Sequence, residues 1–231
     1  MKYIIGNWKA NQDLNSTREY LGEWARLVAE KPLPSEALVA IAPPTALYPI
    51  FLAKIKELNL PILPALQDIS QFGTGTYTGE TVLENLVGME PNMVIVGHSE
   101  RRKNNGENDE AVAKKVDLLL SKQIVPIVCV DEEYIESQAK LIKPEHYDKL
   151  LIAYEPVSAI SAGFGTAKDI NPEQFVPVLE KVRAAFPGCR VIYGGSTAPD
   201  NVKGCFEVCD GVLVGGSSLN AEAFYKMAAQ V

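Results

Sequence analysis

The chain has 231 residues, of which 47% are hydrophobic and 22% are charged, and its formal net charge is -7. This composition is that of a globular protein long enough to bury a large core. An acidic chain lacks the cationic surface that nucleic-acid backbones require, so we expect no DNA or RNA partner. The longest uncharged stretch, 37–53, contains three prolines and is too short for a membrane span, so we expect no membrane partner.

The first apolar run, 1–5, is too short for a secretory signal peptide, and we therefore expect a cytoplasmic protein. No two cysteines form a Cys-x-x-Cys pair, although Cys205 and Cys209 have the spacing of one helix face. Buried, reduced thiols are a better interpretation of the four cysteines than a metal site or a disulfide.

Eight short apolar runs recur along the chain, separated by longer amphipathic stretches. Continuous apolar runs, without alternation of apolar and polar residues, are typical of strands buried on both faces of a sheet. The predicted strands are 2–5, 38–42, 62–66, 93–96, 125–130, 150–154, 190–193 and 211–214.

The segments between the strands carry helix signals. Ser16 and Glu19 have the spacing of a capping box, and Asn108 can cap a second helix. Pro172 suits the first position of a later helix, in which Pro177 predicts a kink.

Eight strand-then-helix units without a linker predict a closed parallel (β/α)8 barrel, with residues 1–231 forming a single domain. An open doubly wound sheet is the alternative, and the number of strands does not exclude it. No Gly-x-Gly-x-x-Gly follows the first strand, which weakens a dinucleotide-binding interpretation. In such barrels the active site lies at the carboxyl ends of the strands.

Three charged or titratable residues follow predicted strands. Glu155 comes directly after an apolar run, where desolvation would make it a better base, although it could equally pair with a cation of a neighbouring strand. A lone histidine is more often structural, but the position of His98 at a strand end favours catalysis. Lys9 is either a surface residue or the positive charge that an anionic substrate needs in an acidic protein.

Two glycine-rich stretches follow the last two strands: Gly194-Gly195-Ser196 and Gly215-Gly216-Ser217. Their exposed backbone N–H groups suit a phosphate. A single Gly-Gly pair often marks only a turn, but the two together match the usual phosphate site of such barrels.

Five motifs in order resemble the triosephosphate isomerase family over nearly the whole chain. They are Gly6-Asn7-Trp8-Lys9, Val96-Gly97-His98-Ser99-Glu100-Arg101-Arg102, Ala153-Tyr154-Glu155-Pro156-Val157, Tyr193-Gly194-Gly195-Ser196 and Leu213-Val214-Gly215-Gly216. The resemblance implies a TIM barrel of glycolysis and gluconeogenesis that interconverts dihydroxyacetone phosphate and D-glyceraldehyde 3-phosphate. The substrate would be a small phosphorylated triose, and neither a metal nor an organic cofactor would be needed.

The resemblance also implies a role for each residue. Glu155 would remove a carbon-bound proton to give an enediolate, while His98, kept neutral by a short helix that follows it, would polarise the carbonyl. Lys9 would stabilise the enediolate and the phosphate, Asn7 would orient the substrate oxygens, and Glu100 would support Lys9. Phosphate would be held by the backbone N–H groups of Ser161, Ser196, Gly215 and Gly216.

Two segments depart from the family's pattern. In the expected lid, 156–167, Ser158 replaces a tryptophan, Ser161 replaces a glycine, and one extra residue lies near Gly165. We expect this lid to be mobile and to become ordered when phosphate binds. The segment 131–149 is shorter than in typical members, which predicts a helix of only one or two turns.

The loop 67–80 predicts a homo-oligomer, most simply a homodimer. Its aromatic residues Phe72 and Tyr77 need a surface to bury them. By the resemblance, Thr78 at its tip would reach Asn11, close to the neighbouring subunit's Lys9 position.

Two alternatives to this function stay open from the sequence alone. One is another phosphate-binding barrel isomerase or an aldolase, although a Schiff-base aldolase would need a lysine at a late strand end. The other is a phosphate-binding scaffold with weakened catalysis, against which the joint presence of Lys9, His98 and Glu155 argues.

Overall fold

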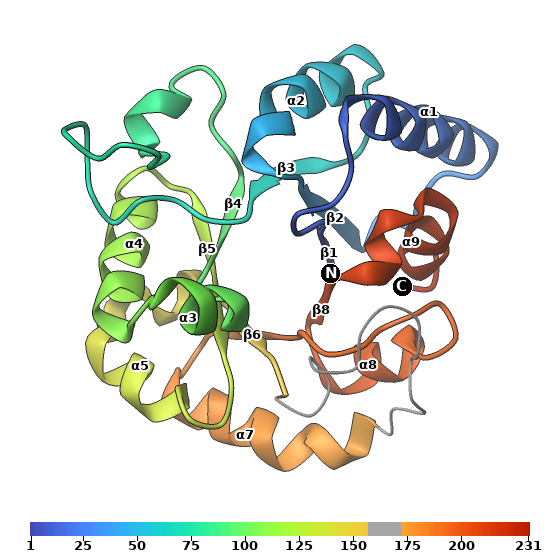
Figure 1. The fold of residues 1–231 in the computed structure, drawn as a ribbon. Coiled ribbons are helices and arrows are strands. Elements are labelled where there is room, and N and C mark those ends of the chain that lie inside the picture. The colour runs from blue at the N-terminus through green and yellow to red at the C-terminus, as the bar shows by residue number, and fades with distance from the viewer. Residues whose placement is uncertain (157–171) are drawn as a thin grey trace.

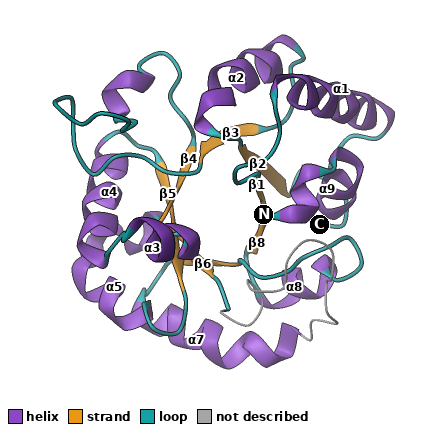
Figure 2. Cartoon of the chain, viewed as in Figure 1, coloured by secondary structure: helices purple, strands orange, loops and turns teal. Residues whose placement is uncertain are grey.

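The computed structural model describes residues 1–156 and 172–231. Its parallel strands are hydrogen-bonded in chain order and close into a barrel, because β8 pairs with β1. Figure 1 shows the strands at the centre with the helices around them, and Figure 2 shows the same two rings by element type. The strands are β1 Lys2–Asn7, β2 Ala37–Ala42, β3 Leu63–Leu66, β4 Met93–Val96, β5 Val125–Val130, β6 Leu151–Tyr154, β7 Arg190–Tyr193 and β8 Gly211–Val214.

These strands confirm the predicted (β/α)8 barrel and exclude the open doubly wound sheet. The predicted strands 93–96, 125–130, 190–193 and 211–214 have the observed bounds. The first strand runs two residues beyond its predicted end, so Asn7 is its last residue and does not follow it.

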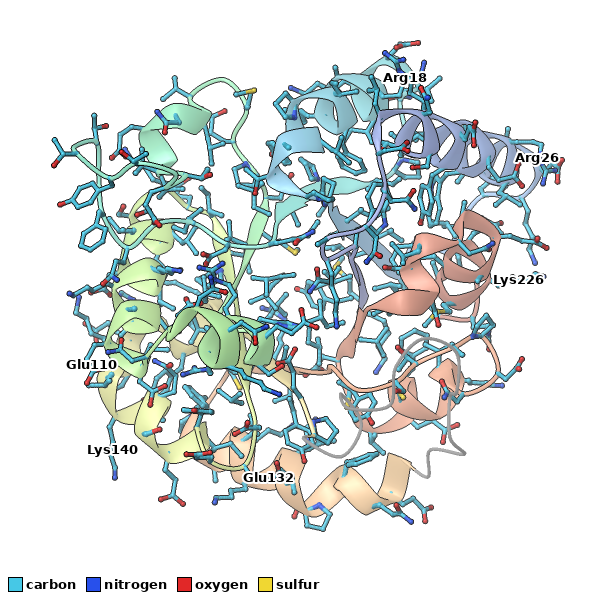
Figure 3. All side chains as sticks on the ribbon, viewed as in Figure 1. Arg18, Arg26, Glu110, Glu132, Lys140 and Lys226 are labelled. Atoms are coloured by element: carbon cyan, nitrogen blue, oxygen red, sulfur yellow. The ribbon has the colours of Figure 1, made fainter. Side chains whose placement is uncertain are left out.

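Helices and short 3-10 turns connect the strands on the outside. The helices are α1 Leu14–Glu30, α2 Tyr48–Glu57, α3 Ser99–Asn105, α4 Asp109–Ser121, α5 Ile135–Leu141, α7 Val176–Ala185, α8 Val202–Val208 and α9 Ala221–Ala228. The 3-10 turns are η1 Thr45–Leu47, η2 Leu83–Leu86, η3 Pro144–Lys149, η4 Pro172–Phe175 and η5 Gly216–Leu219. The seven residues of α5 confirm the short helix predicted after the fifth strand. Figure 3 shows Arg26 of α1 and Lys226 of α9 pointing away from the barrel.

Each strand supplies two cores, because successive side chains point to opposite sides of a sheet. Ile5 lies inside the barrel with Ala40 of β2 and Leu213 of β8, its register partners. Ile4 points outward into the larger core between the strands and the helices. The residue that follows each strand on the inner face therefore emerges at the carboxyl end of the barrel.

Two helix starts differ from the sequence prediction. The capping box of α1 lies one turn earlier than expected, because the Asp13 carboxylate accepts the N–H of Ser16 while the Ser16 hydroxyl accepts the N–H of Asp13. The kink predicted at Pro177 is wrong: α7 begins at Val176, so Pro177 lies in the first turn, where its missing N–H costs no intrahelical bond. The Asn108 cap of α4 is confirmed by its bond from the N–H of Ala111.

The cysteines are free thiols: Cys129, Cys205 and Cys209 are buried, whereas Cys189 is only partly buried. Among the described residues, no helix combines the length and the apolar character needed to cross a membrane.

Candidate active site

Glu155 projects into the carboxyl end of the barrel. Leu151 and Ala153 of β6 belong to the inner core, and Glu155 is the next residue on that face. Its side chain is buried, with 2% of the residue exposed. One carboxylate oxygen accepts the N–H of Ser99 at 3.0 Å, and the other lies 3.0 Å from Nε2 of His98. The end of β4 thus holds both oxygens of this carboxylate.

His98 caps the N-terminus of α3, which is the short helix expected after it. Its Nδ1 accepts the N–H of Glu100 at 3.2 Å. A ring nitrogen that accepts a hydrogen bond carries no proton, so in the neutral imidazole the proton is on Nε2, facing Glu155. The sharp turn into the helix comes from Gly97, whose φ of +70° favours glycine.

Burial and mutual attraction act in opposite directions on this pair. Burial works to lower the pKa of His98, but the neighbouring Glu155 carboxylate outweighs it and raises that pKa above its ordinary value. Burial likewise works to raise the pKa of Glu155, and the contact with His98 lowers it below its ordinary value. Their direct contact therefore holds both pKa values away from those that burial alone would give.

Lys9 extends from the turn after β1 with an unusual backbone conformation, φ +51°. Two polar side chains fix this turn: the side-chain Oδ1 of Asn7 accepts the N–H of Lys9 at 3.0 Å, and the side-chain amide of Gln67 donates to the backbone carbonyls of Lys9 and Ala42. The ammonium group donates to Glu100 at 2.7 Å. Sequence analysis missed Gln67, and its only signal was an amide directly after the third strand.

Both glycine-rich loops lie against these charged residues. A methyl group added to Gly194 would lie 2.9 Å from Cγ of Glu155, closer than a real Cβ can approach. A methyl group added to Gly215 would lie 3.5 Å from Cε of Lys9, in ordinary contact. The ends of β1, β4, β6, β7 and β8 therefore converge on one place. A buried carboxylate, an imidazole N–H and an ammonium gathered there can move a proton on an anionic carbonyl compound.

The sequence model of the triosephosphate isomerase family matches residues 2–231. The chain belongs to the triosephosphate isomerase family. A triosephosphate isomerase of Mesomycoplasma hyorhinis is 34% identical, over 97% of this chain and 96% of the relative. Similar proteins of the same name occur in Clostridium botulinum, at 34% identity over 96% of both chains, and in Thermus thermophilus, at 33% over 96% of this chain and 95% of the relative.

The other residues that the family resemblance singled out lie around this centre or outside it. Ser196 is in the loop between β7 and α8, and the hydroxyl of Ser217 donates to the carbonyl of Thr197 at 2.7 Å, which ties the two glycine-rich loops together. Gly216 begins the 3-10 turn η5, which directs N–H groups outward from its N-terminal end. Ser161 and the rest of the expected lid lie outside the described residues, except for Pro156.

The loop 67–80 begins at this centre with Gln67 and carries two exposed aromatic side chains. Phe72 and Tyr77 stack on each other with ring centroids 4.3 Å apart, and they are 39% and 42% exposed. Thr78 is exposed, whereas Asn11 folds back to donate to the carbonyl of Trp8 at 2.8 Å. In the parts of the chain that the structure describes, no group of three or more His, Cys, Asp or Glu side chains could hold a metal ion.

Proposed function

We propose that this chain is an isomerase that interconverts dihydroxyacetone phosphate and D-glyceraldehyde 3-phosphate by proton abstraction through an enediolate. The observation that carries the proposal is the buried contact between the Glu155 carboxylate and the His98 Nε2 at the carboxyl end of the barrel. Membership of the triosephosphate isomerase family supports the choice of substrate.

Glu155 is the base in this proposal, and His98 is the hydrogen-bond donor to the carbonyl. A substrate that enters between them replaces their mutual contact with contacts to its own carbon and oxygen atoms. Burial is then no longer offset by the contact between the two side chains, so the pKa of Glu155 rises and that of His98 falls. A more basic carboxylate and a neutral imidazole are the forms that the reaction requires.

The remaining polar groups bind the anion and orient it. Lys9 places positive charge beside the developing enediolate, Glu100 holds its ammonium, and Asn7 fixes the turn that carries it. The phosphate binds to backbone N–H groups of the glycine-rich loops, at Ser196, Gly215 and Gly216, and of Ser161 in the lid. No metal or organic cofactor takes part, because the proposed proton transfers need only acid and base groups.

The assembly proposed is a cytoplasmic homodimer of one-domain subunits. The stacked, exposed rings of Phe72 and Tyr77 favour burial of the loop 67–80 against a second copy, in which Thr78 meets Asn11. Light scattering at micromolar concentration is expected to give the mass of two chains, and a monomeric mass would contradict the proposal.

The aldolase alternative is disfavoured by the residues at the ends of the late strands. A Schiff-base enzyme needs a lysine there, whereas β6, β7 and β8 are followed by Glu155, Gly194 and Gly215. A scaffold without catalysis would need no buried carboxylate against an imidazole.

One experiment tests the function against these alternatives. Purified protein is mixed with dihydroxyacetone phosphate in D₂O, and proton NMR follows both the conversion and the deuterium that enters the carbon-bound position. Isomerisation with deuterium incorporation is expected. An absence of both, or cleavage of a larger sugar bisphosphate by the same protein, would contradict it.

A further inference from the structure

The side chain of Arg102 lies directly behind the His98 turn and is almost completely buried, with 4% exposed. Its Nε donates to the carbonyl of Gly97 at 2.7 Å, and its two terminal nitrogens donate to Asp109 at 2.6 Å and to Gln138 at 2.8 Å. The guanidinium also lies 4.1 Å from the ring centroid of Tyr134. The guanidinium of Arg102 therefore links three places: the turn after β4, the start of α4, and α5 together with Tyr134, the residue that precedes it.

The carbonyl that Arg102 holds belongs to the peptide that carries His98. Gly97 has a positive φ, and a methyl group added to it would lie 2.8 Å from the guanidinium and 3.0 Å from Val112. The same guanidinium lies 3.5 Å from the carbonyl oxygen of Cys129 in β5. Because the Gly97 turn is packed against the guanidinium itself, a shift of this group must shift the turn.

The partners of Arg102 are themselves fixed. Gln138 is fully buried, and its amide donates to the carbonyl of Asp109 at 3.1 Å while its oxygen accepts from Arg102. The helices α4 and α5 pack against each other on one side of the barrel, and Figure 1 shows α3 inward of them, nearer the centre of the barrel. The short α5 helix thus reaches the His98 turn through a continuous chain of hydrogen bonds.

We infer that Arg102 is a positioning residue for His98, and that Gln138 of the short α5 acts on the reaction through it. This inference rests on the proposed function. The planar guanidinium of an arginine has several donors in a fixed geometry, so it holds a carbonyl and a carboxylate in one relative position. A lysine ammonium does not reproduce this geometry. Imidazole and base must stay within about 0.5 Å of the productive arrangement, so a loosened turn lowers turnover without removing any group that touches the substrate.

The test compares Gln138→Met and Arg102→Lys with a matched control, Lys2→Met. Lys2 also donates to two backbone carbonyls, those of Phe206 and Cys209, but it does so at the opposite end of the barrel. Both test variants are expected to lose at least about tenfold in kcat, with KM within about twofold, because the glycine-rich loops are on other strands. Lys2→Met is expected to lower the melting temperature and to keep kcat.

A second measurement needs no substrate. Nitrogen-15 NMR of the unliganded protein, recorded above the raised pKa of His98 so that the imidazole is neutral, reports which ring nitrogen carries the proton, and the bond from the Glu100 N–H to Nδ1 predicts Nε2 in the wild type. In Gln138→Met both neutral tautomers of His98 are expected to be populated, because the shifted turn weakens the hydrogen bond from the Glu100 N–H to Nδ1. An unchanged His98 spectrum in folded Gln138→Met, or a fall in kcat no larger than in Lys2→Met, would overturn the inference. If the wild-type protein does not isomerise triose phosphates, the proposed function fails and the NMR result still decides whether Arg102 positions His98.

Discussion

Two groups of charged side chains meet at α3, and their charges are arranged differently. The reaction centre consists of Glu155 and His98. The second group, the structural charge cluster, consists of Asp68, Arg101, Glu107 and Lys115. The helix contributes to both, since His98 caps it and Arg101 lies within it.

In the structural charge cluster, cations and carboxylates alternate around a closed ring. Lys115 bonds to Asp68 at 2.6 Å and to Glu107 at 2.8 Å, and Arg101 bonds to the other oxygens of the same two carboxylates, at 2.8 Å each. Each carboxylate oxygen thus faces a cation. Among the residues that the structure describes, Glu155 instead has no cation beside it other than the imidazole of His98, and its second oxygen accepts a backbone N–H. A closed ring holds its four side chains in one geometry and is damaged when one member is removed, whereas an open pair keeps a base available for chemistry.

The largest expected effect comes from opening the ring. Lys115→Met leaves two buried carboxylates to share one cation, and breaking a buried pair in this way costs about 3–5 kcal/mol of unfolding free energy. The turnover of the molecules that remain folded is expected to stay unchanged. Chemical denaturation and kcat per active site are the measurements, with Lys143→Met, which breaks an exposed pair with Asp117, as the control. A variant as stable as the control would show that the ring contributes little.

The reaction centre is expected to give the opposite result. Glu155→Gln keeps an acceptor for the Ser99 N–H but removes the base, and kcat should fall at least about 10²-fold. The unfolding free energy should change little, because a neutral amide is less costly to bury than a carboxylate. Near-normal turnover in folded Glu155→Gln would remove this residue from the proposed mechanism.

The sequence was sufficient to predict the barrel and most of the residues at its mouth. Apolar runs mark strands buried on both faces, and the fixed geometry of a closed barrel brings their ends together whatever the intervening loops do. Glu155, His98 and Lys9 could therefore be placed at one end from chain order alone.

The features that the sequence could not predict depend on contacts between distant residues. The turn at Lys9 needs Gln67 from another strand end, and the ring around Lys115 joins a loop to two helices. Neither has a local pattern. The two helix starts that differed, at Asp13 and Val176, were missed because several nearby residues could cap or begin each helix.

A pH titration separates the two charge groups in another way. Burial and the neighbouring Glu107 carboxylate raise the pKa of Asp68 from 3.8 to about 6, against the pull of Lys115 and Arg101. The folded protein therefore holds this proton more tightly than the unfolded chain does. The contribution of Asp68 to stability is present below pH 3.8 and is lost as the pH rises through about 6.

We expect Asp68→Asn to gain about 2–3 kcal/mol relative to wild type as the pH rises from 4 to 7, the value of a shift of about two pKa units. Urea denaturation of both proteins at each pH measures this gain. A difference between the two proteins that stayed constant across this range would show that Asp68 titrates normally.

The smallest expected effect concerns the exposed ion pair between Lys9 and Glu100 beside the reaction centre. Lys9 and Glu100 are 34% and 45% exposed at their side chains, so their attraction is weakened by water, and Glu100→Gln should change the unfolding free energy by less than about 1 kcal/mol.

The salt dependence of stability distinguishes this exposed pair from the structural charge cluster more sharply. At about 1 M salt the screening length is about 3 Å, and the stability difference between wild type and Glu100→Gln should vanish. The difference between wild type and Lys115→Met should persist, because Lys115 and Glu107 are only 5% and 4% exposed at their side chains. Equal salt sensitivity of the two differences would mean that the structural charge cluster is open to solvent, and its contrast with the reaction centre would then be one of composition and not of burial.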